Sequence, residues 1–334
     1  MDCVRKSFLL LALSSGGLLS GCSEDLSGLL PTVSIDHQDS AEIARVRSPD
    51  CTDRPRSGAT SDARASIRDE ISVASWNIQV FGKSKMRNRA VMRVIVDIVR
   101  RFDVIAIQEL RSKDQSVIDR FLAMVNRDGY AYDVVVGPRL GRTFSKEQYL
   151  YLYDTSRIQL IDGSVFTPND PRDLLHREPL VASFRVTGAL SANPWTFTLV
   201  NIHTDPDEVR QEVNALDEVI RVVRRMDSED DVILLGDLNA NERQLGELSD
   251  LPNIMWTVRG QPTNTRGTKS YDNILFSGTT TSEFTGHAGV VDLVSEYALT
   301  ARQALAVSDH LPVWATFAPV ERSRTLAADG RFVR

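Results

Sequence analysis

Eight polar side chains stand where apolar stretches of the chain stop, and their types suit one kind of chemistry. They are Asn77, Glu109, His203, Asp237, Asn239, Asp272, Asp309 and His310. Carboxylate and amide oxygens are suitable ligands for a hard cation such as Mg²⁺. Histidines close to such an ion titrate in the range that a general acid and a general base need. The set therefore predicts metal-assisted chemistry on a phosphate ester.

Each of these side chains, taken alone, also has a purely structural explanation. Asn77 and Asn239 could cap turns, and Asp309 could be an ordinary turn residue before Pro312. A single histidine such as His203 is more often a buried, hydrogen-bonded residue than a catalyst. Carboxylates at strand ends are often simply solvated. The chemical interpretation therefore depends on the whole set meeting at one place.

The elements that must position these residues are strands with a few helices between them. Buried strands are predicted over 71–78, 103–110, 132–138, 148–154, 180–186, 195–203, 231–239, 271–276 and 312–318. Helices are predicted over 88–102, 116–126 and 206–226, because apolar residues recur there at helical spacing. Asp205 is expected as the N-cap of the last helix, with Glu208 completing a capping box. Neighbouring strands without an intervening helix favour mixed sheets covered by helices on their outer faces.

The composition is that of a folded domain without a broad basic surface. The chain has 334 residues, of which 42% are hydrophobic and 25% charged, and its formal net charge is −6 at pH 7. These values support a packed core and argue against wholesale disorder. The negative charge argues against a protein that holds nucleic acid mainly through an extended basic face. It does not exclude an enzyme that meets phosphate through bound cations.

The N-terminus has the pattern of an export signal. Residues 4–22 (VRKSFLLLALSSGGLLSGC) combine a basic start, a short apolar run and small residues before a cysteine. The run is too short and too rich in Gly and Ser for a transmembrane helix. Its end, LSGC, resembles the bacterial lipobox, in which the cysteine becomes the lipidated first residue of the mature chain. The alternative is an ordinary cleaved signal peptide in which Cys22 is incidental.

The lipobox resemblance implies an exported protein of the bacterial cell envelope. Lipidated Cys22 would anchor it to a membrane, at the outer membrane and periplasm or at the cell surface. We expect the signal peptide over 1–21, a lipidated flexible tether over 22–69, one catalytic domain over 70–319 and a tail over 320–334. Of the three cysteines, Cys3 lies in the predicted signal peptide and Cys22 would be lipidated. Only Cys51 remains, so no internal disulfide is expected in the mature chain.

Five motifs in this order, WNIQVFG, IQEL, GDLNA, YDNILF and SDHLPV, resemble those of the endonuclease/exonuclease/phosphatase superfamily. Within it the chain resembles the deoxyribonuclease I branch from Ile71 to Phe317, including GPRLGRTFSKEQYLYLYD and REPLVASF. The resemblance implies an α/β fold, a four-layered sandwich with two mixed central β-sheets packed face to face and helices on the outer faces. It also implies hydrolysis of DNA phosphodiesters with Mg²⁺ or Mn²⁺ and little sequence preference.

The resemblance further implies a role for each matching residue. The metal ligands would be Asn77, Glu109, Asp237 and Asp309. The catalytic residues would be His203, His310, Glu147, Asp272, Asp237 and Asn239. Substrate would be contacted by Arg111, Arg142, Arg177 and Asn239.

Each histidine would have its own carboxylate partner, Glu147 for His203 and Asp272 for His310. Such a partner raises the basicity of an imidazole and fixes its tautomer. One histidine would activate water and the other would protonate the leaving oxygen. Which histidine takes which part stays open.

Three features differ from the deoxyribonuclease I branch. No disulfide is expected, whereas the branch contains stabilising disulfides. The segment FTPNDPRDLLHREP is shorter but keeps Asp170, Asp173 and Glu178, which implies one structural Ca²⁺. In the deoxyribonuclease I branch a second calcium loop has an acidic residue where this chain has Gln261. The branch also has an aromatic residue that enters the minor groove of DNA, and this chain has Phe-Ser at 144–145 in its place.

Three functions remain to be separated. The first is a metal-dependent, largely sequence-nonspecific DNA endonuclease, monomeric and tethered to a membrane. The alternative is a metal-dependent phosphoesterase that uses the same site on small or lipid phosphate esters. The REP and KEQYLYLYD matches favour the nuclease. A binding module without activity is disfavoured, because Glu109, His203, Asp237 and His310 are all present.

Overall fold

The computed structural model describes residues 44–46, 70–188, 193–226 and 229–322. All of them belong to one compact unit, Val33–Arg334. The predicted signal peptide, Cys22 and Cys51 lie outside the described residues. Within the described part of the chain, no helix is both long enough and apolar enough to cross a membrane.

The strands form two sheets. In spatial order, the seven-stranded sheet contains β1 (Ala44–Val46), β4 (Tyr132–Val136), β5 (Gln148–Asp154), β3 (Val104–Leu110), β2 (Ile71–Phe81), β13 (Val313–Phe317) and β12 (Phe284–Val290). The six-stranded sheet contains β10 (Ile254–Trp256), β11 (Asp272–Ser277), β9 (Val232–Asp237), β8 (Thr196–His203), β7 (Leu180–Val186) and β6 (Ile158–Leu160). Both sheets are mixed, because β2–β3 and β8–β9 are parallel pairs among antiparallel ones.

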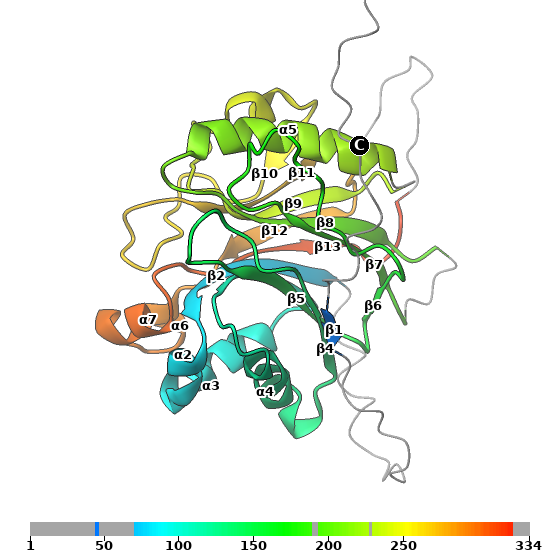
Figure 1. Ribbon diagram of the computed structural model, residues 1–334. Coiled ribbons are helices and arrows are strands. Elements are labelled where there is room, and N and C mark those ends of the chain that lie inside the picture. Colours follow the sequence, from blue (N-terminus) through cyan, green and yellow to red (C-terminus); the bar gives the residue numbers. More distant parts are fainter. Residues whose placement is uncertain (1–43, 47–69, 189–192, 227–228, 323–334) are drawn as a thin grey trace, which may run out of the picture. The chain divides into compact units, whose positions relative to one another are not determined.

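Helices cover the outer face of each sheet. One long helix, α5 (Val209–Met226), packs on the six-stranded sheet, whereas α3 (Arg89–Val99) and α4 (Ser116–Val125) pack on the seven-stranded sheet (Figure 1). The shorter helices are α2 (Lys83–Arg87), η2 (Arg127–Gly129), η3 (Gly246–Asp250), α6 (Leu293–Glu296) and α7 (Ala301–Val307). The four-layered sandwich expected from the sequence is thereby confirmed.

Apolar side chains fill the space between the two sheets as well as the space under the helices. Because successive strand residues point to opposite faces, Val73 of β2 enters the core between the sheets and Trp76 enters the core under α3 and α4. Between the sheets, the Trp195 ring stacks on Phe197 at 4.1 Å and on Phe317 at 4.8 Å between ring centroids. Burial on both faces explains why these strands are nearly continuous apolar runs in the sequence.

Described residues on both sides of the predicted catalytic domain, 70–319, make contacts with it. Ala44–Val46, inside the expected tether, pairs with β4 as strand β1, which covers a sheet edge that would otherwise be open. At the other end, Glu321 Oε1 accepts the Thr196 backbone N–H at 2.8 Å. The Arg322 backbone N–H donates to Glu283 Oε1 at 2.7 Å. The packed unit therefore extends past 319.

Helix α5 begins later than its capping pattern predicted. It starts at Val209, and the segment before it forms a turn in which the Glu208 N–H donates to the Asp205 carbonyl at 3.0 Å. The physical reason is Glu212, a fully buried carboxylate. It accepts the backbone N–H of Asp205 at 2.8 Å and that of His176 at 2.6 Å. The Asp205 backbone is thereby held in the loop.

Candidate active site

The candidate catalytic side chains meet because strand registers align their positions. In the six-stranded sheet, Asp237 at the end of β9 lies opposite both His203 of β8 and Asp272 of β11. Three neighbouring strands thus place titratable side chains at one edge. Asn77 of β2 and Glu109 of β3 stand near the ends of a parallel pair in the other sheet. A hydrogen bond from Asn77 to Asp237 shows that the two edges adjoin.

Each catalytic-type histidine is paired with a buried carboxylate. His203 Nδ1 lies 2.8 Å from Glu147 Oε1, and His310 Nδ1 lies 2.9 Å from Asp272 Oδ2. The Nε2 atoms of both histidines lie 3.5 Å from the same atom, Oδ2 of Asp237. Both imidazoles therefore turn their second nitrogen toward one point, which is the arrangement that a paired acid and base require.

The charges of this group support one another. Burial lowers the pKa of His310, but the combined opposite effect of Asp272 and Asp237 is larger. The pKa of His310 therefore rises to about 11. Burial likewise lowers the pKa of His203, and Glu147 and Asp237 bring it above its ordinary value. Burial raises the pKa of Asp237, whereas His310 and His203 lower it below its ordinary value. Asp237 is therefore an ionised carboxylate between two imidazoles.

Oxygen and amide groups converge beside the histidines. Asn77 Nδ2 donates to Glu109 Oε1 at 3.1 Å and to Asp237 Oδ2 at 3.0 Å. Glu109 has a φ of 65°, and its Oε2 accepts the Val80 N–H at 2.7 Å. Asn239, with a φ of 47°, donates its backbone N–H to Asp237 Oδ1 at 3.0 Å. Left-handed backbone at non-glycine residues costs about 1–3 kcal/mol and is concentrated at functional sites.

The donor set fits a hard divalent cation. Ligand atoms of Asp237, Asp272 and His310 all lie within 4.8 Å of one another. Asp272 Oδ1 is buried and has no hydrogen-bond partner among the described residues. Together with the carboxylate of Glu109, which Asn77 Nδ2 joins to Asp237, these groups give the oxygen-rich environment that Mg²⁺ and Mn²⁺ prefer.

Asp309 adjoins this group without lining the cleft. Its backbone carbonyl accepts the Thr265 N–H at 2.8 Å. Its charge reaches Lys85: burial lowers the pKa of Lys85 to about 8, against the opposing effect of Asp309 and then Glu109. Lys85 Nζ donates to the Val307 carbonyl at 2.8 Å and also to carbonyls at 78 and 79. The sequence motifs do not include Lys85.

Two of the three candidate substrate arginines lie in the cleft, but in different ways. Arg111 lies 3.2 Å from Glu109 Oε2 and is partly exposed. Arg177 is buried: its Nη2 donates to the His203 carbonyl at 2.9 Å, and its Nε lies 3.2 Å from Glu147 Oε1. Arg111 is therefore accessible to a substrate. Arg177 instead contacts both members of the His203–Glu147 pair and holds them in position.

Arg142 lies outside the cleft and is engaged within the protein. Its Nε lies 3.1 Å from Asp173 Oδ1, and its Nη1 lies 2.6 Å from Glu208 Oε2. This bears on the calcium site predicted from Asp170, Asp173 and Glu178, because the Asp173 carboxylate already has a cationic partner. Burial, with Asp170 and Asp173 nearby, raises the pKa of Glu178. Calcium at this place stays a prediction.

The cleft also contains residues that the sequence did not single out. His176 Nδ1 lies 3.3 Å from Asp205 Oδ2, and both side chains line the cleft. Ser145 Oγ accepts a hydrogen bond from Arg111 Nη1 at 3.1 Å. The available signal for His176 was its rarity, since the chain has five histidines, and its position directly before Arg177.

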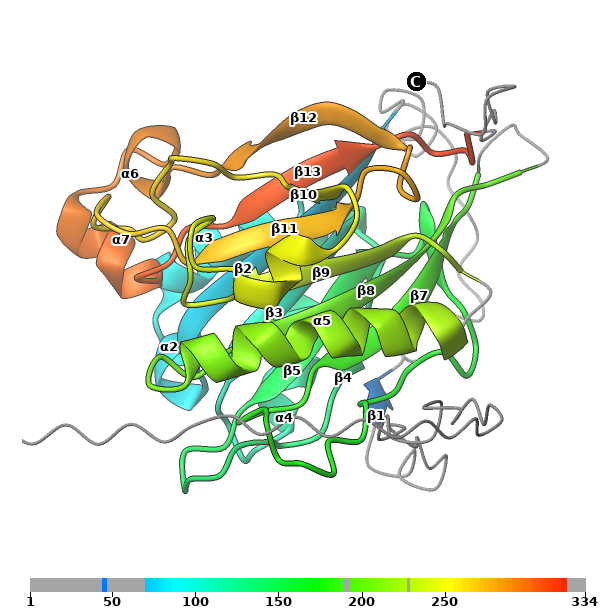
Figure 2. The same ribbon diagram turned by 90° about the horizontal axis from the view of Figure 1, so that it is seen from above.

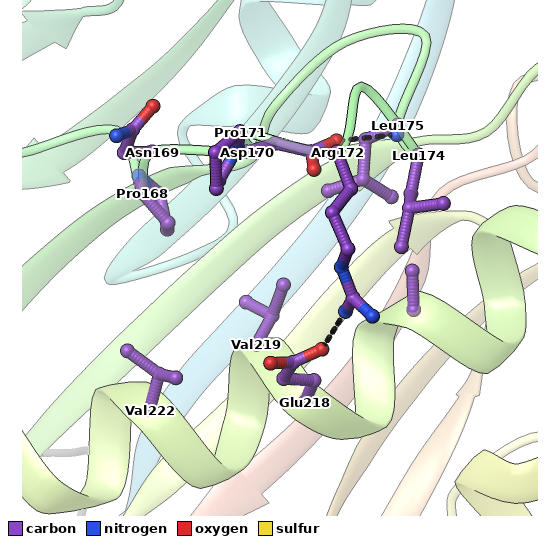
Figure 3. A pocket seen from close by; sticks show the side chains of 11 residues that line it. Pro168, Asn169, Asp170, Pro171, Arg172, Leu174, Leu175, Glu218, Val219 and Val222 are labelled. Carbon is purple, nitrogen blue, oxygen red and sulfur yellow. Dashed lines mark hydrogen bonds and ion pairs between the residues drawn. The ribbon is translucent and has the colours of Figure 1, made fainter. Parts of the chain in front are cut away.

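These groups surround an open cleft of about 760 Å³. The sequence-predicted residues that line it are Asn77, Glu109, Arg111, Arg177, His203, Asp237, Asn239 and His310. A second hollow lies between the segment 168–175 and α5, where Arg172 pairs with Glu218 (Figure 3). That hollow is lined mainly by Pro, Leu and Val side chains and contains none of the candidate catalytic residues.

Comparisons with known proteins agree with this geometry. Residues 74–310 match the Endonuclease/Exonuclease/phosphatase family. The chain is 31% identical to deoxyribonuclease-1 of Bos taurus over 261 residues, which cover 74% of this chain and 92% of that protein. It is 32% identical to deoxyribonuclease-1-like 1 of Homo sapiens over 253 residues, which cover 72% of this chain and 82% of that protein.

Solved structures show the same fold. The endonuclease/exonuclease/phosphatase from Bacteroides vulgatus superposes with a TM-score of 0.53 at 14% identity, covering 76% of this chain and 100% of that one. A functionally unknown conserved protein from Enterococcus faecalis V583 gives 0.53 at 16% identity, covering 74% and 100%. The chain belongs to the endonuclease/exonuclease/phosphatase family, in its deoxyribonuclease I-like branch.

Proposed function

We propose that the chain is a divalent-cation-dependent DNA endonuclease with little sequence preference. Its family indicates a hydrolase of phosphodiester bonds, and the relatives named deoxyribonuclease favour DNA as the substrate. The observation that carries the proposal is the pair of histidine Nε2 atoms, each 3.5 Å from Asp237 Oδ2, in an open cleft. A scissile phosphate in that cleft would lie between an acid and a base.

The chain's own residues supply proton transfer and positioning. Glu147 and Asp272 occupy the Nδ1 sides of His203 and His310, so the Nε2 atoms remain for the reaction. One Nε2 takes a proton from water, and the other gives a proton to the leaving oxygen. Arg177 fixes the His203–Glu147 pair by contacting both members.

The metal-binding role falls to the oxygen-rich side of the cleft. Asn77, Glu109 and Asp237 in the cleft, with Asp309 adjoining it, would hold Mg²⁺ or Mn²⁺, which supplies Lewis-acid stabilisation of charge on the phosphate. Asn239 would help to position the scissile phosphate beside Asp237. Arg111, which is partly exposed in the same cleft, would contact a substrate phosphate.

A small basic surface beside the cleft favours a polyanionic substrate. Lys113, Arg139 and Lys146 gather around a hollow at the 143–146 loop, together with Arg142, which also pairs with Asp173 and Glu208. Phe144 in this loop is fully exposed, at 105%. Phosphate contacts of this kind fix the position of DNA without reading its sequence. A local patch is also compatible with the net charge of −6.

Lys113→Ala and Lys146→Ala are expected to weaken DNA binding for all sequences alike. Each lost phosphate contact should reduce the slope of log K against log salt by about 0.9. Arg185→Ala is the matched control, because Arg185 is exposed at the far end of β7. The measurement is binding of a duplex oligonucleotide at several salt concentrations, with Ca²⁺ in place of Mg²⁺. Equal slopes for all three variants would remove this surface from the DNA interface.

The test of the function is a plasmid assay. The full chain is incubated with supercoiled plasmid and Mg²⁺, with and without EDTA. Metal-dependent appearance of nicked and linear DNA supports the nuclease. If a folded, metal-binding chain leaves DNA intact but hydrolyses a small phosphodiester or a phospholipid, the phosphoesterase alternative holds instead.

We also propose that the enzyme is a monomer anchored in the bacterial envelope by lipidated Cys22. Cys22→Ser is expected to move the protein from the membrane fraction to the soluble fraction, because the acyl chains are then absent. The measurement is fractionation of cells that express each form, with Cys51→Ser as the matched control. A Cys22→Ser protein that stays in the membrane fraction contradicts the lipid anchor.

A further inference from the structure

A second acidic cluster lies at the opposite end of the sheets from the catalytic cleft. It consists of Asp231, Glu283 and Glu321, whose carboxylate ligand atoms all lie within 4.8 Å of one another. Asp231 immediately precedes β9, a strand of six residues whose far end is Asp237. At about 3.3 Å per residue, the cluster and Asp237 are therefore roughly 20 Å apart.

The three carboxylates come from both sheets. Asp231 precedes β9 of the six-stranded sheet, whereas Glu283 precedes β12 and Glu321 follows β13 of the seven-stranded sheet. Figure 2 shows that the start of β9 and the end of β13 lie on the same side of the molecule. A ligand bound here would connect the two layers.

Two of these carboxylates have an unsatisfied buried oxygen. Asp231 and Glu283 are each 1% exposed. Asp231 Oδ2 accepts the Trp195 Nε1–H at 2.8 Å, and Glu283 Oε1 accepts the Arg322 backbone N–H at 2.7 Å. Their other oxygens, Asp231 Oδ1 and Glu283 Oε2, have no hydrogen-bond partner among the described residues. Buried polar atoms in folded proteins almost always have a partner, so an ion or water is the expected explanation.

No cation among the described residues balances the charge of the cluster. Among the described residues, no Lys or Arg forms an ion pair with Asp231, Glu283 or Glu321. Arg322, the neighbouring cation, directs its Nη1 to the Ser282 carbonyl at 2.8 Å. Burial, followed by Glu283, with smaller effects of Glu229 and Glu321, raises the pKa of Asp231 to about 9. Ionised carboxylates at this place need a counter-ion.

We propose that Asp231, Glu283 and Glu321 form a Ca²⁺ site that clips the two sheets together. Oxygens that ligate one Ca²⁺ at 2.3–2.6 Å lie at most about 5 Å apart, and the carboxylate oxygens of the cluster all lie within 4.8 Å of one another. Three carboxylates supply a hard, strongly negative ligand set, and Glu321 is partly exposed, which gives an ion a path from solvent. The site is separate from catalysis and does not depend on the proposed nuclease activity.

The experiment is thermal unfolding of the full chain in EDTA and after titration with CaCl₂. At Ca²⁺ concentrations about 100-fold above the Kd, binding should raise the Tm by about 5–10 °C. Glu109→Gln, which alters the catalytic cleft, should keep this shift. Glu283→Gln should lose the part of the shift that this cluster contributes, and in EDTA it should unfold at a higher temperature than the unmodified protein because one repulsive charge is gone.

Matched variants separate the cluster from general effects of Ca²⁺. Glu247→Gln removes an exposed carboxylate on η3 and should respond to Ca²⁺ like the unmodified protein. Trp195, which donates to Asp231, supplies a local readout: its fluorescence should change with Ca²⁺, and Trp195→Phe should abolish that change.

Two results would overturn the site. If Ca²⁺ shifts the Tm of Glu283→Gln as much as that of the unmodified protein, no ion binds in the cluster, and the carboxyls hold shared protons or water instead. If Glu283→Gln does not fold, Glu321→Gln takes its place, because the Glu321 side chain is only partly buried. An unchanged Ca²⁺ response in that variant overturns the proposal in the same way.

Discussion

His310→Ala is expected to lower plasmid nicking by about 10²- to 10⁴-fold, the usual contribution of one positioned acid or base. The imidazole Nε2 lies 3.5 Å from Asp237 Oδ2, and Nδ1 lies 2.9 Å from Asp272 Oδ2. Alanine removes the proton carrier, and the alanine side chain fills only part of the space. The measurement is the rate of conversion of supercoiled to nicked plasmid at saturating Mg²⁺.

The same substitution leaves Asp272, which is fully buried, without its partner. Burial raises the pKa of this carboxyl, and Asp237 adds to the rise, so Asp272 can take up a proton in the variant. A buried polar group that loses its partner costs about 1–3 kcal/mol of the free energy of unfolding. We therefore expect a folded but less stable protein, which thermal unfolding can check.

Two further variants make the His310 result specific. His310→Asn keeps an amide that can donate to Asp272 but cannot carry a proton, so it should be as inactive as alanine and more stable. His287→Ala is the matched histidine control, since this side chain is 69% exposed and pairs with Glu70 at 3.4 Å. Cleavage by His310→Asn at the rate of the unmodified protein would falsify the acid–base assignment.

The buried strands and the positions of the polar residues at their ends could be predicted from the sequence. Long apolar runs identify strands that are covered on both faces, and residues such as Asp237 and His203 follow directly from where those runs stop. The motif order could not show that both histidines face one oxygen of Asp237. That point depends on the register of β9 with β8 and β11, which only the folded sheet fixes.

Strand β12 could not be recognised because packing, rather than propensity, maintains it. Its sequence, FTGHAGV, contains two glycines and is largely half-exposed. A Cβ added at Gly289 would meet the Trp314 ring at 3.2–3.3 Å, so a larger side chain would crowd the neighbouring strand. Such a requirement is invisible in a local pattern. The three-residue strands β6 and β10 were missed because they are too short to show a period.

The roles of three buried or half-buried charged side chains could not be predicted from the sequence either. Arg177, Glu212 and Lys85 look like surface charges in the sequence, yet each is wholly or largely withdrawn from solvent in the fold. Glu212 lies on a helix whose apolar face alone predicted its orientation. Its partners are the backbone N–H of Asp205, just before the helix, and that of His176, 36 residues away. A sequence pattern records a residue type and a spacing, but not a partner thirty residues away.

Removal of divalent cations is expected to abolish nicking, and added Mg²⁺ or Mn²⁺ to restore it. Lewis-acid stabilisation of a phosphoryl oxygen contributes several kcal/mol, and because about 1.4 kcal/mol corresponds to tenfold, we expect a loss of about 10³-fold or more. The carboxylates around Asn77 make this requirement specific to oxygen-binding ions. The measurement is the nicking rate after dialysis against EDTA, followed by titration with each metal.

Chelation would also empty the proposed Ca²⁺ site, so variants must separate the two requirements. Glu109→Gln removes a charge from the cleft and should raise the Mg²⁺ concentration for half-maximal cleavage. Glu283→Gln should leave that concentration unchanged while it removes the stabilisation by Ca²⁺ bound at its own cluster, since that cluster lies at the other end of β9. Nicking that persists in EDTA contradicts metal dependence. A change in the Mg²⁺ concentration that Glu283→Gln needs for half-maximal cleavage would mean that the acidic cluster and the catalytic cleft are coupled through the strands that connect them.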